Sequence, residues 1–211
     1  MAFDLYVITD EEIGRGRSHA ELARLAVAGG ADAVQLRDKR LSGLDLYRAA
    51  VAVRRVTRDA GALFIVNDRL DVALAAGADG VHLGESDLPI EEARRLAPPG
   101  FIIGASVSSV ATAVLAAAAG ADYVALSPTF TTGSKDDAGP GYGLTVLAEI
   151  RQAISVPLVA IGGITTENVG DVIAAGADGV AVISAVVGKA DVTAAARDLR
   201  GRIAGAKVKS R

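Results

Sequence analysis

Short apolar runs alternate with longer amphipathic or alanine-rich stretches along the whole chain. The short runs are rich in Val, Leu and Ile, which is typical of strands buried on both faces of a parallel sheet, and the longer stretches have helical periodicity. The pattern predicts strands over residues 4–9, 33–36, 63–66, 80–83, 101–105, 123–126, 158–161 and 179–183. It predicts helices over residues 19–28, 43–60, 70–76, 90–96, 110–119, 145–153, 167–175 and 192–203.

Eight strands that alternate with eight helices predict an α/β fold, a single (β/α)8 TIM barrel over residues 1–211. An open, doubly wound sheet is the alternative, although nothing in the pattern marks a reversal of strand order. The connections are short and no linker divides the chain. We expect the basic end of the chain, residues 205–211, to be a frayed tail.

An internal repeat supports this architecture. Gly-Ala-Asp precedes an apolar run four times, with the aspartate at positions 32, 79, 122 and 178. In each copy a helical pattern stops at the glycine, which is typical of a helix C-terminus. Because each aspartate stands at the start of a strand, away from the end where such barrels carry out chemistry, we predict a structural role for it.

Net charge, cysteine content and the length of apolar runs exclude or disfavour several classes of protein. The net charge of −3 disfavours a nucleic-acid partner, and the absence of cysteine excludes disulfides, thiolate nucleophiles and zinc–cysteine sites. The longest apolar stretch, near residues 110–119, is too short for a membrane span, and the first ten residues lack the basic region of a signal peptide. We therefore expect a cytoplasmic protein with small-molecule ligands, with no membrane or nucleic-acid partner.

Polar residues follow the predicted strands where parallel strands present their carboxyl ends. Gln35, Arg37 and Lys39 alternate along an extended segment, so they share a face and suit a polyanion such as pyrophosphate. For Arg37 alone, a solvated loop is an equal alternative.

The next two strands are followed by oxygen ligands. Asn67, Asp68 and Asp87 match the preference of Mg²⁺ for carboxylate and amide oxygens, although Asn67, Asp68 or Asp87 could instead cap the following helices. His82 lies within its strand, and we interpret it as a satisfied core or second-layer histidine, with a catalytic base as the alternative. We expect His19, at a helix start, to be on the surface.

Three later segments add hydroxyl groups and backbone donors. We expect Ser106, which has no evident base beside it, to hydrogen-bond a ligand. The long aperiodic segment 127–143 is typical of a functional lid, with an inert insertion as the alternative, and it offers Thr132, Ser134 and Lys135 to a phosphate. A second phosphate site is predicted where the last two strands end. Its donors are Gly163, Ile183 and Ser184.

The motifs QLRDK, VNDR, HLGESDLP, IGASVS, TFTTGSK, AIGGI and VAVISA, in this order, resemble those of the thiamine-phosphate synthase family, over about nine-tenths of the chain. The resemblance implies a transferase. It joins hydroxymethylpyrimidine pyrophosphate to a thiazole phosphate, or to its carboxylated form, and yields thiamine phosphate and pyrophosphate. It also implies a Mg²⁺ cofactor and a dissociative mechanism, in which pyrophosphate leaves before the thiazole nitrogen adds.

The same resemblance implies roles for individual residues. The pyrimidine pyrophosphate would be bound by residues 35–39, which include Gln35, Arg37 and Lys39, and by Asn67, Ser106 and Lys135. Mg²⁺ would be bound by Asp68 and Asp87, and the thiazole phosphate by Thr132, Gly133, Ser134, Gly163, Ile183 and Ser184. The catalytic residues would be Lys39, Ser106 and Lys135, and the two lysines would stabilise negative charge on the leaving group.

Two positions depart from the family pattern. Ser134 stands where the family's lid has a second threonine, and Ser108 stands where the family has a histidine. Two alternative functions stay open: a thiazole tautomerase of the same fold, and a non-catalytic phosphate-binding barrel. The tautomerase tends to lack the lysine of QLRDK and the metal aspartates, and to keep a histidine where this chain has Ser108. The oligomeric state is open too, a homo-oligomer included.

Overall fold

The computed structural model of the chain describes residues 3–134 and 140–209. Eight parallel strands close into a barrel in chain order, and β8 pairs with β1. The strands are β1 (Leu5–Thr9), β2 (Ala33–Leu36), β3 (Leu63–Asn67), β4 (Gly80–Leu83), β5 (Ile102–Val107), β6 (Tyr123–Leu126), β7 (Leu158–Ile161) and β8 (Gly179–Val182). The predicted (β/α)8 TIM barrel is confirmed.

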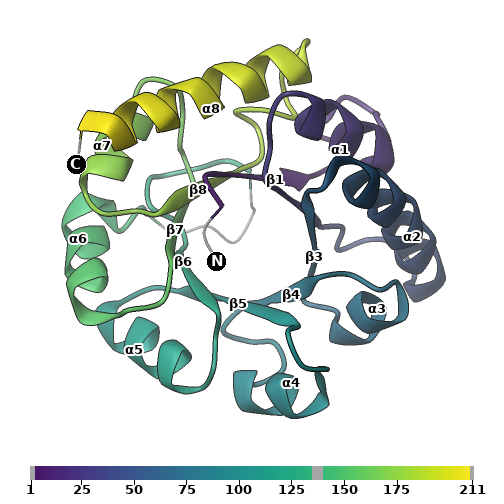
Figure 1. The fold of residues 1–211 in the computed structure, drawn as a ribbon, viewed down its shortest axis with the longest axis horizontal. Helices are drawn as coiled ribbons and strands as arrows, with labels where there is room; N and C mark the ends of the chain where they lie inside the picture. The colour runs from purple at the N-terminus through teal and green to yellow at the C-terminus, as the bar shows by residue number, and fades with distance from the viewer. Residues whose placement is uncertain (1–2, 135–139, 210–211) are drawn as a thin grey trace.

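The helices form an outer ring around the strands (Figure 1). They are α1 (His19–Ala28), α2 (Gly43–Ala60), α3 (Leu70–Ala75), α4 (Ile90–Leu96), α5 (Val110–Ala118), α6 (Gly143–Ala153), α7 (Val169–Ala174) and α8 (Val192–Lys209). Helical periodicity predicts most of their ends to within two residues. Within the described part of the chain, none of the helices combines the length and hydropathy that a bilayer span requires.

The repeated aspartates connect neighbouring strands and helices at the amino-terminal end of the barrel. Each one accepts a hydrogen bond from a backbone N–H at the start of the preceding strand and pairs with an arginine of an even-numbered helix. Asp79, for example, accepts from Phe64 N at 2.8 Å and from Arg54 of α2 at 2.9 Å. The other three pairs are Asp32 with Arg200, Asp122 with Arg94, and Asp178 with Arg151. Their predicted structural role is confirmed.

The end of the chain differs from the expectation. The sequence predicts a frayed tail over residues 205–211, whereas α8 continues as a helix to Lys209, and residues 210–211 lie outside the described part of the chain. The ammonium group of Lys207 contacts the Asp4 carboxylate and the Asp178 carbonyl, next to the repeated aspartates. These long-range contacts, which local sequence does not reveal, stabilise the last turns of the helix.

Candidate active site

Cavities open where the strands end at their carboxyl side, and two of them hold most of the predicted site residues. The first, of about 450 Å³, we name the carboxylate pocket. Its lining residues are Arg37, Lys39, Asn67, Asp68, His82, Gly84, Glu85, Ser86, Asp87, Ser106, Val107, Ser108, Ser127, Pro128 and Tyr142. Most of the residues predicted for the pyrophosphate and the metal therefore meet in one cavity.

The two aspartates of this pocket form its acidic centre. Burial, the hydrogen bond to Asp87 and the negative charge of Asp87 together raise the pKa of Asp68 to about 6, against the opposing charges of Lys39 and Arg37. Asp68 also has a positive φ of 61°, a strained conformation that is found more often at functional sites than elsewhere. Two neighbouring carboxyl groups fit a divalent cation, whose positive charge would offset the repulsion between them.

The structure does not show the helix-capping alternative for these residues. Arg69 is the N-cap position of α3, Pro89 is that of α4, and neither helix has a side-chain capping bond. Asp87 instead accepts a hydrogen bond from Gly84 N at 2.7 Å, which fixes one of its oxygens within its own loop. The carboxyl groups are thus aimed at the cavity and not at a helix end.

The segment that carries Arg37 and Lys39 is anchored by the residue between them. Asp38 accepts hydrogen bonds from the backbone N–H groups of Arg40 and Leu41, at 2.7 and 3.0 Å. Although burial opposes it, these bonds and a contact with His19 lower the pKa of Asp38, so this side chain is ionised at neutral pH. These bonds fix the turn that follows Asp38, and Arg37 and Lys39 on either side of it both line the carboxylate pocket.

The expectation that His19 lies on the surface is wrong. Its side chain is 2% exposed, with Nδ1 at 2.8 Å from Thr9 Oγ1 and Nε2 at 3.4 Å from Asp38 Oδ2. A helix start is usually solvated, but this one packs under the loop after β2. His19 therefore connects β1 to the loop that bears Arg37 and Lys39.

Gln35 lies deeper than the other predicted ligands. Its side chain is buried and donates from Nε2 to the Tyr6 hydroxyl at 2.6 Å, and it is not among the residues that line the carboxylate pocket. Arg37, which does line the pocket, follows two residues later, and two residues along a strand are about 6.6 Å apart. The structure thus places Gln35 one layer below the cavity.

Ser106 and His82 connect the pocket to the barrel interior. Ser106 Oγ lies at 2.9 Å from His82 Nε2, and His82 Nδ1 lies at 2.9 Å from the Tyr123 hydroxyl. The interpretation of His82 as a satisfied core histidine is confirmed. At the rim, Ser108 donates to Glu85 at 2.6 Å, so the position where the family pattern has histidine here holds a hydroxyl bound to a carboxylate.

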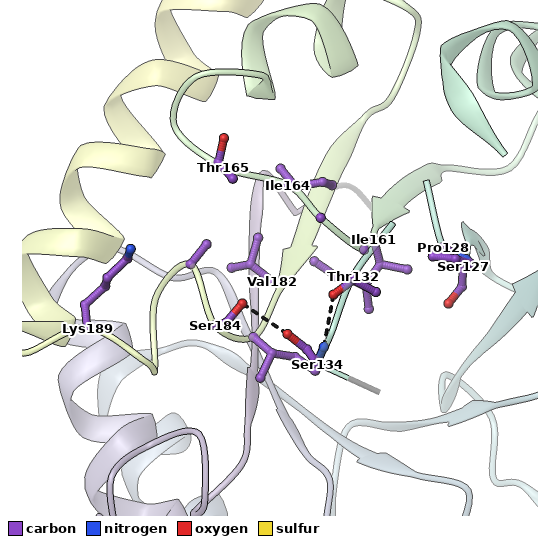
Figure 2. Close-up of a pocket in the computed structure, with 15 residues that line it drawn as sticks. Ser127, Pro128, Thr132, Ser134, Ile161, Ile164, Thr165, Val182, Ser184 and Lys189 are labelled. Carbon is purple, nitrogen blue, oxygen red and sulfur yellow. Dashed lines mark hydrogen bonds between the residues drawn. The ribbon is translucent and has the colours of Figure 1, made fainter. Parts of the chain in front are cut away.

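The second cavity, of about 200 Å³, we name the glycine pocket (Figure 2). It brings together Thr132, Ser134, Gly163, Ile183 and Ser184, all predicted for the second phosphate. Ser134 donates to Ser184 at 3.1 Å, so the start of the long loop reaches the end of β8. Gly133 lies beside Arg37 and Lys39 in a neighbouring cavity. Lys135 lies outside the described residues.

Glycine at position 163 is required by close packing. A side-chain carbon there would lie 2.6 Å from the Thr131 carbonyl oxygen, and the backbone has a positive φ of 64°. The loop after β7 therefore packs directly against the start of the long loop and leaves its backbone at the pocket wall.

Sequence reasoning missed Lys189. Among the described residues that line the glycine pocket, Lys189 is the charged one, and Figure 2 shows its amino end pointing toward the pocket. Arg15 and Arg17 of the β1–α1 loop hydrogen-bond the carbonyls of residues 188–190, which holds the loop that carries it. A lone lysine in a loop after the last barrel strand, close to the predicted phosphate donors, was the available signal.

The donor set limits how a metal could bind. Within residues 3–134 and 140–209, no three His, Cys, Asp or Glu side chains gather into a metal cage. Asp68 and Asp87 are two oxygen ligands, and Mg²⁺ commonly takes one or two protein carboxylates and completes its octahedron with substrate phosphate and water. The residues present therefore fit Mg²⁺ held jointly with a phosphorylated substrate.

Comparison with known proteins finds relatives over nearly the whole chain. The profile of the family described as thiamine monophosphate synthase matches residues 5–186. The chain is 77% identical over 211 residues to the thiamine-phosphate synthase of Methanoculleus marisnigri, and the alignment covers 100% of both chains. It is 65% identical over 207 residues to that of Methanoregula boonei, which covers 98% of this chain and 96% of the relative.

A solved structure shows the same overall fold. The thiamine phosphate pyrophosphorylase of Pyrococcus furiosus superposes with a TM-score of 0.89 at 44% identity, over 96% of each chain. A 3-hexulose-6-phosphate synthase at 24% identity has a TM-score of 0.74 over 94% of this chain and 99% of that one, which shows the shared fold alone.

Proposed function

The chain belongs to the thiamine monophosphate synthase family, and on this premise we propose how its barrel carries out the family's reaction. The reaction condenses a pyrimidine pyrophosphate with a thiazole phosphate, which makes the protein a transferase of thiamine biosynthesis. The observation that carries the proposal is that the two pockets share a wall. Ser127 and Pro128 line both the carboxylate pocket and the glycine pocket, so two substrates can meet there.

The carboxylate pocket binds the pyrimidine pyrophosphate. Arg37 and Lys39 supply positive charge beside the carboxyl pair, and Asn67 and Ser106 supply polar groups that can orient the substrate. Asp68 and Asp87 would hold Mg²⁺, which when bound would offset negative charge on the pyrophosphate. Lys135 is proposed from the sequence as a further cation for the same leaving group.

The glycine pocket binds the thiazole phosphate. Backbone N–H groups of Gly163, Ile183 and Ser184 and the hydroxyls of Thr132 and Ser134 are suitable phosphate donors. Gly133 is proposed from the resemblance as a further contact. We add Lys189, whose ammonium group gives this pocket the full positive charge that neutral donors lack.

The mechanism is dissociative. The bond between the pyrimidine methylene carbon and pyrophosphate oxygen breaks first, with both electrons leaving on oxygen, and the thiazole nitrogen then donates its lone pair to the resulting cation. This chemistry needs positioning and charge stabilisation more than a strong base, and the carboxylate pocket provides cations and hydroxyls.

One assay tests the condensation against the alternatives. Both substrates are incubated with the protein and Mg²⁺, and formation of thiamine phosphate is followed. A parallel sample contains the thiazole carboxylate phosphate alone. We expect thiamine phosphate in the first sample and no isomerisation in the second, because Ser108 is paired with Glu85 and offers no acid–base group near neutrality. Isomerisation without condensation would identify a tautomerase, and binding without either reaction a phosphate-binding barrel.

A further inference from the structure

A continuous chain of polar side chains crosses the apolar interior of the barrel beneath the carboxylate pocket. Gln35 donates to Tyr6 at 2.6 Å, the hydroxyls of Tyr6 and Tyr123 lie 3.2 Å apart, and Tyr123 lies 2.9 Å from His82 Nδ1. His82 Nε2 then lies 2.9 Å from Ser106 Oγ, in the pocket wall. Five strands contribute one residue each: β1, β2, β4, β5 and β6.

The packing shows that these side chains are held in place. Tyr6 and Tyr123 are each 1% exposed, and the ring of Phe3 contacts both at centroid distances of 5.0 and 5.1 Å. His82 stacks on Tyr123 with an interplanar angle of 28°. A side-chain carbon at Gly104 would lie 2.0 Å from the Tyr123 ring, so β5 needs glycine at this point to admit the ring.

The number of hydrogen atoms on these groups determines which group donates in each hydrogen bond of the series from Gln35 to Ser106. The amide nitrogen of Gln35 only donates, so the Tyr6 hydroxyl accepts from it and passes its own hydrogen to Tyr123. Tyr123 then donates to His82 Nδ1, which must be without hydrogen, and the hydrogen of the ring stays on Nε2. In the opposite direction, the Tyr6 hydroxyl would have no acceptor among the described residues, and a buried unsatisfied donor is costly.

Both tyrosines carry the hydrogens that this count requires. Burial raises the pKa of Tyr6 and of Tyr123 well above the ordinary tyrosine value. Both phenols therefore keep their hydrogens at any pH at which the enzyme would work, and both remain able to donate.

We propose that the Gln35–Tyr6–Tyr123–His82 chain fixes His82 as the Nε2–H tautomer and thereby makes the Ser106 hydroxyl a hydrogen-bond donor toward the substrate. Ser106 accepts from His82, so its own hydrogen points into the carboxylate pocket. His82, Tyr123 and Tyr6 are positioning residues, because they act on the substrate through Ser106. The inference rests on the proposed function in assigning this pocket to the pyrimidine pyrophosphate, whose anionic oxygens and ring nitrogens are acceptors.

A measurement on the free wild-type protein tests the direction without any substrate. The chain has only two histidines, so ¹⁵N spectra of the imidazole nitrogens at pH 8 are simple to assign with a His19→Gln variant. We expect His82 to be the Nε2–H tautomer. The Nδ1–H tautomer would mean that Gln35 faces Tyr6 with its oxygen and that Ser106 donates to His82, which would overturn the proposal.

A double-mutant cycle tests the function of the chain. Tyr123→Phe removes the donor to Nδ1, and we expect kcat to fall about 10-fold with an unchanged KM for the thiazole phosphate, together with a shift of His82 toward the Nδ1–H form. Adding Tyr123→Phe to Ser106→Ala should cause no further loss, because the chain acts through Ser106. If the double variant loses activity by the product of the two single-variant factors, the two residues act independently and the proposal is overturned.

Controls separate positioning from stability. If Tyr123→Phe does not fold, Tyr6→Phe replaces it, because it interrupts the hydrogen-bond chain one residue earlier. We expect the same fall in kcat and the same shift of the His82 tautomer from it. Tyr47→Phe, on the exposed face of α2, should change neither the spectra nor the rate. The tautomer measurement stands whether or not the protein forms thiamine phosphate, so failure of the proposed function is distinguishable from failure of this inference.

Discussion

The side-chain carboxyl groups of Asp68 and Asp87 are hydrogen-bonded to each other at the mouth of the barrel, although they follow different strands. Burial and the neighbouring carboxylate raise the pKa of Asp68 to about 6, so the pair takes up a proton below about pH 6, and a metal would compete with that proton. This arrangement costs stability in the absence of metal, and it sets the first two predictions.

We predict that Asp68→Asn stabilises the metal-free protein at pH 8 by on the order of 1 kcal/mol, because it removes a partly buried charge beside Asp87. Asparagine also tolerates the positive φ at this position. Since the folded-state pKa lies above the ordinary value of 3.8, the favourable contribution of the protonated form is present below about pH 4 and is lost as the pH rises through about 6. The gain should therefore disappear near pH 4. Thermal unfolding in EDTA measures it.

A matched control is Asp71→Asn, which removes a carboxylate from a largely exposed pair with Arg69. We expect little change or a slight loss of stability from it at pH 8. If Asp68→Asn lowers the melting temperature at pH 8 while Asp71→Asn does not, the carboxyl pair stabilises the fold and its assignment as a metal site loses support.

The same pair should make catalysis depend on metal and pH. We predict that Asp68→Asn and Asp87→Asn each reduce kcat by about 10² or more, the scale for losing one major charge-stabilising group. Mg²⁺ affinity should fall as the pH drops below about 6, because protons compete for Asp68. Calorimetry of Mg²⁺ binding with pyrophosphate at pH 5.5 and pH 8 checks this, and full activity in excess EDTA would refute it.

Lys189 should act on one substrate only. We predict that Lys189→Met raises the KM for the thiazole phosphate about 10-fold, because one charge-assisted contact is lost, and leaves the KM for the pyrimidine pyrophosphate unchanged. Lys189→Arg should retain most of the affinity. Steady-state kinetics at low and high salt measure the effect, which should shrink at high salt.

The control for Lys189 is Lys209→Met, which removes an exposed lysine at the end of α8. It should not change either KM. An equal rise in KM for both substrates after Lys189→Met, or an equal loss of affinity for the thiazole alcohol without its phosphate, would show that Lys189 does not contact the phosphate.

The repeated aspartates should contribute stability and no catalysis. We predict that Asp79→Ala lowers the free energy of unfolding by roughly 2–3 kcal/mol, because Phe64 N and Arg54 both lose their acceptor. Asp59→Ala, which removes a 75% exposed carboxylate near the end of α2, should change it by less than about 0.5 kcal/mol. Urea titration compares the two. A similar small effect for both would leave the repeat without an energetic role.

The sequence alone determined the barrel and the edge where the site lies. Period and turn signals are local, so the strand that ends at Asn67 and the segment that bears Asp87 could be placed without coordinates. Closing eight parallel strands brings their carboxyl ends together, and this explains why Asp68, Asp87, Arg37 and Lys39 meet in one pocket as predicted.

Only the tertiary structure decided how deeply each site side chain is buried and which residues far apart in the sequence contact one another. Gln35 and Arg37 are two residues apart in the sequence, but which one lies inside the barrel depends on how far the strands are staggered. His19 is buried because a loop from another unit covers it, and Lys189 reaches the glycine pocket because two arginines from the β1–α1 loop hold its backbone. These contacts join residues far apart in the chain, and local periodicity carries no information about them because it reports only on neighbours along one element.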